Sequence, residues 1–387
     1  MKNILFFIFL FSSITSFCQN NEFSTLQKKG IILPYNDDSG VPLITINLDN
    51  KAYNFIFDTG SPFTVLNSNR FEIESNSGQK KVKDVNDKIN TINKINFNTL
   101  SFGKEKSNET DIKKRSLYLS PLEDPLFECN NIDGVLGWDL VSKYIVELNP
   151  TKKVIILYPY DVPIFEEYLK TGEYYNLKYN KKGSDLRPLL NVNINNKKQN
   201  FLLDSGFNGY ISANASDYEN LKTTHPFQTF LGYEAIGFFG QTNETLYKSF
   251  IIKNTEANFD DNFNLKTNIE IGEKEKNIIG FSFMKQQPII MSWYKKMILI
   301  KKDPNIYLQS SKEKFGIGIS YFNNKYIISD IDDNMKDLKL DQQVIKINGT
   351  PIENICNYRT YINQQNSLVL TITDENSTFD VKLDLLK

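Results

Sequence analysis

Apolar and polar side chains alternate in the same order along two stretches of this chain. Residues 41–68 and 187–214 align without a gap at an offset of 146, and nine aligned positions are identical. Each stretch has a strand-like alternation, a polar turn and a second apolar run, which together predict a β-hairpin. The alternating segments span residues 43–48 and 189–194, and the turns are expected at Asn50-Lys51 and Asn196-Lys197.

Each predicted hairpin ends in a carboxylate. The first ends in Asp58 within the sequence Asp-Thr-Gly, and the second ends in Asp204 within Asp-Ser-Gly. A single such tripeptide is common as a plain turn. Because the two copies lie at matched positions of an internal repeat, we expect the two carboxylates to act together.

A second matched element follows each hairpin. Residues 135–138 read Val-Leu-Gly-Trp, and residues 278–281 read Ile-Ile-Gly-Phe. In each copy a short helical stretch and two further apolar strands are expected after this element. These strands are predicted at residues 144–148, 152–157, 288–291 and 295–300, with a partly helical connector at 164–170.

The pattern changes near Phe315, where a third unit is expected to begin. We predict a removed leader at residues 1–18, folded units at 30–158, 186–302 and 315–387, and a linker at 303–314. The chain has 387 residues, 40% of them apolar, with 28 Phe and 20 Tyr. Aromatic residues favour strands, so the expected fold class is mainly β, with two pseudo-symmetric β lobes followed by a small β domain.

Composition excludes several kinds of chemistry. The 45 basic and 46 acidic side chains leave a formal charge of −1, which argues against nucleic acid as a partner. The single histidine, His225, excludes sites that need two imidazoles, and no G-x-S-x-G sequence presents a serine nucleophile. Carboxylates remain as the candidate catalytic groups, and neither a metal nor a cofactor is expected.

The N-terminus has the pattern of an export signal. Lys2 precedes an apolar run, and Ser16-Phe17-Cys18 resembles a cleavage site, so the mature chain is expected to start near Gln19. The protein is therefore expected to be periplasmic or secreted, with lipid anchoring at Cys18 as the alternative. No transmembrane helix is expected in the mature chain. Since Cys129 and Cys356 fall in different predicted units, a disulfide is not expected.

The two tripeptides and the later apolar-apolar-Gly elements resemble the active-site signatures of aspartic proteases, with the short lobes of the retropepsin-like branch but two lobes in one chain. The resemblance implies acid-protease-type lobes, polypeptide substrates and an endopeptidase in which Asp58 and Asp204 share one proton and activate water. It also implies a set of supporting residues around the pair, namely Thr59, Gly60, Ser61, Ser205, Gly206, Gly137 and Gly280.

One departure bears on activity. Phe207 stands where the first copy has Ser61, so the second signature lacks a small polar residue after its glycine. The alternative function is a catalytically silent scaffold of the cell envelope that binds extended peptides.

The C-terminal unit resembles a PDZ domain. The resemblance depends on Val-Ile-Lys-Ile-Asn-Gly at residues 344–349 and on a Gly-Ile-Gly-Ile sequence. It implies that a peptide C-terminus or a recruited substrate would bind at Gly316, Ile317, Gly318 and Ile319. The alternative is a small β domain that binds nothing.

Overall fold

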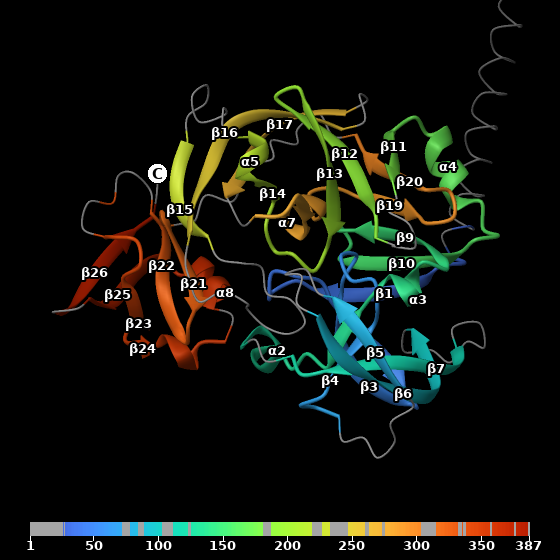
Figure 1. Cartoon of the computed structure of the whole chain (residues 1–387), viewed down its shortest axis with the longest axis horizontal. Coiled ribbons are helices and arrows are strands. Elements are labelled where there is room, and N and C mark those ends of the chain that lie inside the picture. Colours follow the sequence, from blue (N-terminus) through green and yellow to red (C-terminus); the bar gives the residue numbers. More distant parts are fainter. Residues whose placement is uncertain are drawn as a thin grey trace, which may run out of the picture.

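The computed structural model describes most of the chain, and Figure 1 shows its arrangement. The chain is mainly β, as the sequence predicts. The described residues are 26, 28–71, 78–83, 89–102, 111–122, 125–180, 187–218, 227–232, 247–259, 263–272, 275–302, 315–331, 335, 338–356, 358–374 and 377–385. The predicted leader, Cys18 and His225 lie outside them.

The described residues of the first part of the chain form ten strands and two short helices. They are β1 (Ile31–Asn36), β2 (Leu43–Leu48), β3 (Lys51–Phe57), β4 (Val65–Asn67), β5 (Gly78–Lys83), β6 (Ile89–Phe102), β7 (Asp111–Ser120), α2 (Pro125–Cys129), β8 (Gly134–Leu136), α3 (Trp138–Val141), β9 (Tyr144–Asn149) and β10 (Val154–Pro159).

The second part repeats much of this order. Helix α4 (Ile164–Lys170) connects the two parts. The elements after it are β11 (Tyr174–Asn180), β12 (Leu189–Ile194), β13 (Lys197–Asp204), β14 (Ile211–Asn214), α5 (Ala215–Tyr218), β15 (Phe227–Gly232), β16 (Tyr247–Phe259), β17 (Phe263–Gly272), β18 (Ile278–Gly280), α7 (Phe281–Met284), β19 (Ile289–Ser292) and β20 (Met297–Lys301).

The pairing of strands is the same in both parts. Strand β2 pairs with β3, which runs parallel to β8; β8 pairs with β4, β4 with β7, β7 with β6, and β6 with β2 again. Strands β12, β13, β18, β14, β17 and β16 pair in the same cyclic order. Each set therefore closes on itself, and we call them the first barrel and the second barrel.

The turns of the two repeated hairpins lie one residue earlier than the sequence predicts. The left-handed residues are Asp49 and Asn50 in one hairpin and Asn195 and Asn196 in the other, with φ between 46° and 68°. Asn and Asp tolerate this conformation, and two such residues in a row form the tight turn whose twist matches the flanking strands. Lys51 and Lys197 accordingly begin the second strands.

A third sheet joins the two barrels. Its strands follow the order β1, β10, β9, β19, β20 and β11, so β9 from the first part pairs with β19 from the second. Its buried face packs on α4 through Phe165 and Tyr168. The barrels are thus held side by side by continuous backbone hydrogen bonds, and Figure 1 shows this sheet between them.

The C-terminal unit has its own core of buried residues, which includes Phe315, Ile328 and Leu370. Its strand β22 pairs with β15 of the second part at Asp330 and Phe230. Its elements are β21 (Ile317–Phe322), β22 (Lys325–Ile331), β23 (Gln343–Ile347), β24 (Thr350–Pro351), the 3-10 helix η1 (Ile352–Asn354), α8 (Tyr358–Gln364), β25 (Ser367–Thr373) and β26 (Thr378–Asp384).

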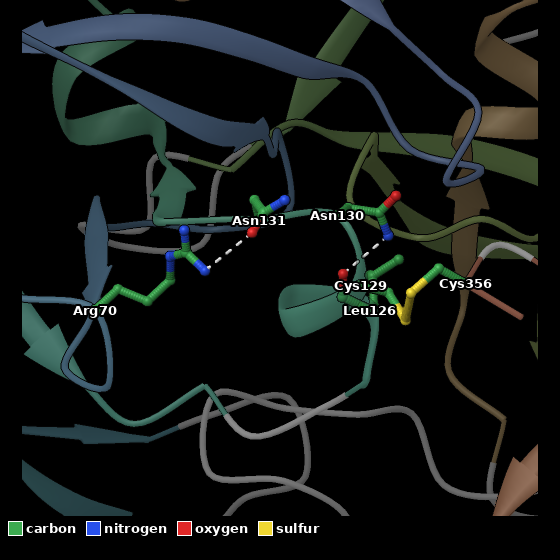
Figure 2. Close-up of a disulfide and its surroundings, with 6 residues drawn as sticks. All are labelled: Arg70, Leu126, Cys129, Asn130, Asn131 and Cys356. Atoms are coloured by element: carbon green, nitrogen blue, oxygen red, sulfur yellow. Dashed lines mark hydrogen bonds between the residues drawn. A yellow bond between two sulfur atoms is a disulfide. The ribbon is translucent and has the colours of Figure 1, made fainter. Parts of the chain in front are cut away.

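A disulfide joins the C-terminal unit to the first part, contrary to the sequence-based expectation. Cys129 at the end of α2 is bonded to Cys356, 227 residues later in the chain (Figure 2). The expectation was wrong because membership of different units says nothing of whether those units are in contact.

Within the described part of the chain, no helix has the length and apolar character needed to cross a bilayer.

Candidate active site

Asp58 follows directly after β3, where the parallel strand β8 fixes its backbone. The Asp58 N–H donates to the Leu136 carbonyl at 3.0 Å. The Asp58 side chain is held by the turn that follows, since Oδ1 accepts the N–H groups of Gly60 at 2.7 Å and Ser61 at 3.0 Å. The carboxyl group therefore has one oxygen fixed by main-chain donors.

Asp204 occupies the matching position at the end of β13, beside the parallel strand β18. Its Oδ1 accepts the N–H of Gly206 at 2.9 Å, and the N–H of Phe207 also bonds to the carboxyl group. The Phe207 N–H thus donates to Asp204 as the Ser61 N–H donates to Asp58 in the first copy. The second copy therefore keeps this main-chain support of its carboxylate, although it has Phe207 at the position aligned with Ser61.

The two carboxyl groups meet where the barrels adjoin. Each glycine of the two tripeptides lies against the aspartate of the other copy: a Cβ atom on Gly206 would come within 2.6 Å of Asp58 Cγ, and one on Gly60 would overlap the Asp204 carboxyl. Only glycine permits this approach. A hydrogen bond joins the side chains of Asp58 and Asp204, and both residues keep partial access to solvent.

Thr59 and Ser205 join the two tripeptides through hydrogen bonds. The Thr59 hydroxyl donates to the Leu203 carbonyl at 2.7 Å and accepts the Ser205 N–H at 2.9 Å. Reciprocally, the Ser205 hydroxyl donates to the Phe57 carbonyl at 2.6 Å and accepts the Thr59 N–H at 3.0 Å. Both residues are fully buried, so water cannot replace these four bonds.

The surroundings of the two carboxyl groups raise both of their pKa values, but not by the same causes. Burial, the Asp204 charge and the hydrogen bond to Asp204 raise the pKa of Asp58 well above its ordinary value. Burial also raises the pKa of Asp204, but the hydrogen bond from Asp58, the Gly206 N–H and the charge of Arg187 oppose this rise. The two groups therefore titrate as one coupled pair that shares a proton, with the pKa of Asp58 raised the more strongly.

Gly137 and Gly280 support the pair from behind. Gly137 begins α3 against the backbone of Phe63, where a Cβ atom would lie 2.5 Å from the Phe63 carbonyl oxygen. Gly280 begins α7 and packs in the same way on the backbone of Phe207. All seven predicted supporting residues therefore lie in or against the two aspartate turns.

Arg187 is a residue of this site that the sequence reasoning missed. It directly precedes Pro188, whose carbonyl accepts the Leu203 N–H at 3.0 Å, and its charge acts on Asp204. The aligned residue in the first copy is Val41, which is buried in an apolar cluster. A charge in place of an apolar residue within an otherwise matched repeat was the available signal.

The predicted peptide-binding residues lie apart from the aspartate pair, in the C-terminal unit. Ile317 and Ile319 are buried in the core of that unit, and Gly316 has a φ of 72°. Gly318 lies against Asp330 on the neighbouring strand. The carbonyl of Ile319 accepts the Tyr358 hydroxyl from α8 at 2.7 Å, so this acceptor is already used within the unit.

The described residues contain no group of three side chains suited to hold a metal ion. What the site offers instead is a proton held between two carboxyl groups. Such a pair can take a proton from water and give one to a bound carbonyl oxygen.

Comparison with known proteins gives no family for this chain. No family model matches it, and no curated protein matches it. Among solved structures it is similar to conglutin gamma, a basic 7S globulin from lupine seeds, with a TM-score of 0.46 and 8% identity over 71% of this chain and 95% of that chain. A likeness at this level carries no argument about function.

These findings contradict the family assignment made from the sequence motifs. No family model matches the chain, so neither a protease family nor a PDZ family is found for it. The assignment to two-lobed, retropepsin-like aspartic proteases with a C-terminal PDZ domain is withdrawn. The binding role of residues 316–319 stays a prediction. Short motifs carried that assignment, and short motifs also occur outside the families they typify. The arrangement of Asp58 and Asp204 does not depend on that assignment.

Proposed function

We propose that this chain is a hydrolase that cleaves peptide bonds within polypeptides by means of a water molecule activated between Asp58 and Asp204. The observation that carries the proposal is the pair of hydrogen-bonded carboxyl groups at the ends of two matched hairpins, each lying against the glycine of the other copy. Two carboxyl groups in contact cannot both ionise at low cost, so they divide the roles of acid and base.

In the proposed reaction Asp204 is the base and Asp58 is the acid. Asp204 takes a proton from the water molecule, whose oxygen attacks the carbonyl carbon of the peptide bond. Asp58 gives its proton to the carbonyl oxygen, which yields a tetrahedral diol. The diol collapses when a hydroxyl proton returns to Asp58 and the proton on Asp204 passes to the leaving nitrogen, so that the C–N bond breaks and the pair regains its starting state.

The lock between Thr59 and Ser205 supports this assignment. Proton sharing demands that the carboxyl groups keep their separation within a few tenths of an ångström while substrate binds and leaves. Four buried hydrogen bonds between the two turns provide that constraint. A turn with a merely structural aspartate needs no such connection to a second turn.

We further propose that the barrels are two pseudo-symmetric lobes with the active site between them. A separate proposal is that the chain is exported. Disulfides persist in oxidising compartments, so the bond between Cys129 and Cys356 supports export. Mass spectrometry of the protein recovered from the periplasm or medium tests this, and an N-terminus that still carries residues 1–18 would contradict it.

The proposed activity is tested with purified protein and an unfolded substrate such as casein, from about pH 3 to about pH 7. We expect cleavage by the native protein and a loss of about 100-fold or more in Asp58→Asn and Asp204→Asn. Asp161→Asn, a change at an exposed carboxylate, is the matched control and should cleave like the native protein. Cleavage that survives both dyad changes would refute the proposal, and absence of cleavage by the native protein would favour a silent peptide-binding scaffold.

A further inference from the structure

A pocket lies at the junction of the first part and the C-terminal unit, apart from the aspartate pair. Its volume is about 340 Å³, which is within the range of small-ligand sites. The first part contributes Glu128 and Cys129 from α2, while the C-terminal unit contributes Tyr321, Tyr326 and Glu353, among others. Neither part forms this pocket without the other.

The disulfide is part of the wall that closes this pocket. Cys129 is both a lining residue and a partner in the bond to Cys356. Glu128 is adjacent to Cys129 in α2, and Glu353 lies in η1, three residues before Cys356. Figure 2 shows the bond linking the end of α2 to the C-terminal unit. Formation of the bond therefore brings two carboxylates from distant parts of the sequence to one pocket.

The charge of the lining is unbalanced. Glu128 and Glu353 contribute two negative charges, and Lys325, the exposed first residue of β22, contributes one positive charge. The charged side chains of the lining therefore sum to a net charge of −1, and a negative lining attracts cations and repels anions. A guest with a positive charge is therefore favoured over a neutral or an anionic one.

The aromatic residues of the lining indicate what kind of cation fits. The rings of Tyr321 and Tyr326 lie 5.0 Å apart between centroids and are both partly exposed. Aromatic faces attract guanidinium and ammonium groups, and a planar guanidinium also pairs with carboxylates through two parallel hydrogen bonds.

We propose that this pocket binds the arginine side chain of a polypeptide, and that it does so only while the bond between Cys129 and Cys356 is intact. The guanidinium lies between Glu128 and Glu353, and its flat face rests on the tyrosine rings. The inference is independent of the catalytic proposal, since the pocket shares no residue with the aspartate pair.

The test measures binding of two synthetic peptides to the oxidised full-length protein by saturation-transfer NMR. One peptide is acetyl-Gly-Gly-Arg-Gly-Gly-amide, and the other carries citrulline, the neutral isostere of arginine, at the same position. Asp58→Asn protein is used throughout, so that no peptide is consumed. We expect the arginine peptide to bind at least about tenfold more tightly than the citrulline peptide.

Variants locate the binding. The double change Glu128→Gln with Glu353→Gln should reduce binding of the arginine peptide to the citrulline level. The matched control, Glu173→Gln with Glu256→Gln, alters two exposed glutamates elsewhere and should leave binding unchanged. Equal binding of both peptides, or retention of arginine selectivity in the Glu128 and Glu353 variant, would overturn the proposal.

A redox arm tests the dependence on the disulfide. Protein treated with dithiothreitol, and separately the Cys356→Ser variant, should lose the arginine-peptide signal, while circular dichroism shows that the strands remain. The C-terminal unit should stay folded because it has its own core. Undiminished binding by the reduced protein would contradict the proposed dependence, and displacement of the peptide by millimolar CaCl₂ at constant ionic strength would show a metal site instead.

Discussion

Thr59 and Ser205 each donate a hydroxyl hydrogen bond to the other turn and accept a backbone N–H from it. The two residues are 146 positions apart in the chain, and each follows an aspartate of the proposed catalytic pair. The four bonds tie the two turns to each other and so help to fix the position of Asp58 relative to Asp204.

Loss of either hydroxyl should weaken both stability and activity. We expect Thr59→Ala to lower the free energy of unfolding by about 1–3 kcal/mol, because the Ser205 N–H then has no acceptor in a buried site. Thr59→Ser retains the hydroxyl and is the matched control. Denaturant unfolding and casein cleavage measure the two effects, and equal behaviour of the alanine and serine variants would show that the lock is unimportant.

Asp58→Asn should stabilise the protein at neutral pH. A folded-state pKa above the unfolded value of about 3.8 means that the contribution of Asp58 to stability is complete at acidic pH and is lost as the pH rises through the folded-state pKa. The amide removes that loss and still accepts the Gly60 N–H. The melting temperatures of the native protein and the variant should therefore differ more at pH 7 than at pH 4, with the variant the more stable at pH 7. A variant that is less stable than the native protein at pH 7 would contradict the raised pKa.

Arg187→Gln should shift the acidic limb of the cleavage profile to higher pH. The positive charge of Arg187 lowers the pKa of Asp204, so its removal lets Asp204 take up a proton at higher pH, and the base is lost earlier as the pH falls. Cleavage at the acidic end should fall several-fold, with little change near the optimum. Arg187→Lys keeps the charge and should follow the native profile, whereas unchanged profiles in both variants would remove Arg187 from the mechanism.

Tyr168→Phe should destabilise the sheet between the barrels. Buried Glu147 accepts the hydroxyls of Tyr168 at 2.6 Å and Tyr158 at 2.8 Å, so loss of one donor leaves a buried carboxylate less well solvated. We expect a decrease of about 1–3 kcal/mol in the free energy of unfolding. Tyr294→Phe, at a residue that is 75% exposed, is the control and should change stability little.

Much of the fold could be predicted because it is encoded locally and twice. The alternation of residues 43–48 and 189–194 gave the observed strands β2 and β12 without error, and α4 has the predicted bounds. Repetition also gave the match of Gly137 with Gly280. The hairpin turns were misplaced by one residue, because an Asn-Lys pair has the composition of a turn while the twist of the flanking strands places it at Asp49-Asn50.

The rest depends on contacts between segments that are distant in the sequence. Nothing local indicates that Cys129 and Cys356 are in contact, since the spacing of 227 residues carries no information about how the C-terminal unit docks. The lowering of the Asp204 pKa by the charge of Arg187 could not be predicted either, because these two residues become neighbours only once the hairpin is folded. Glu147 likewise resembles an ordinary strand residue until Tyr158 and Tyr168 are placed around it.

The bond between Cys129 and Cys356 closes most of the chain into a covalent ring, and Asp204 lies within it while Asp58 lies outside. A single backbone cut anywhere between the two cysteines, including a cut made by another copy of this chain, would therefore release no fragment under oxidising conditions. Such a nicked molecule would keep both aspartates in one particle and would come apart only after reduction and unfolding.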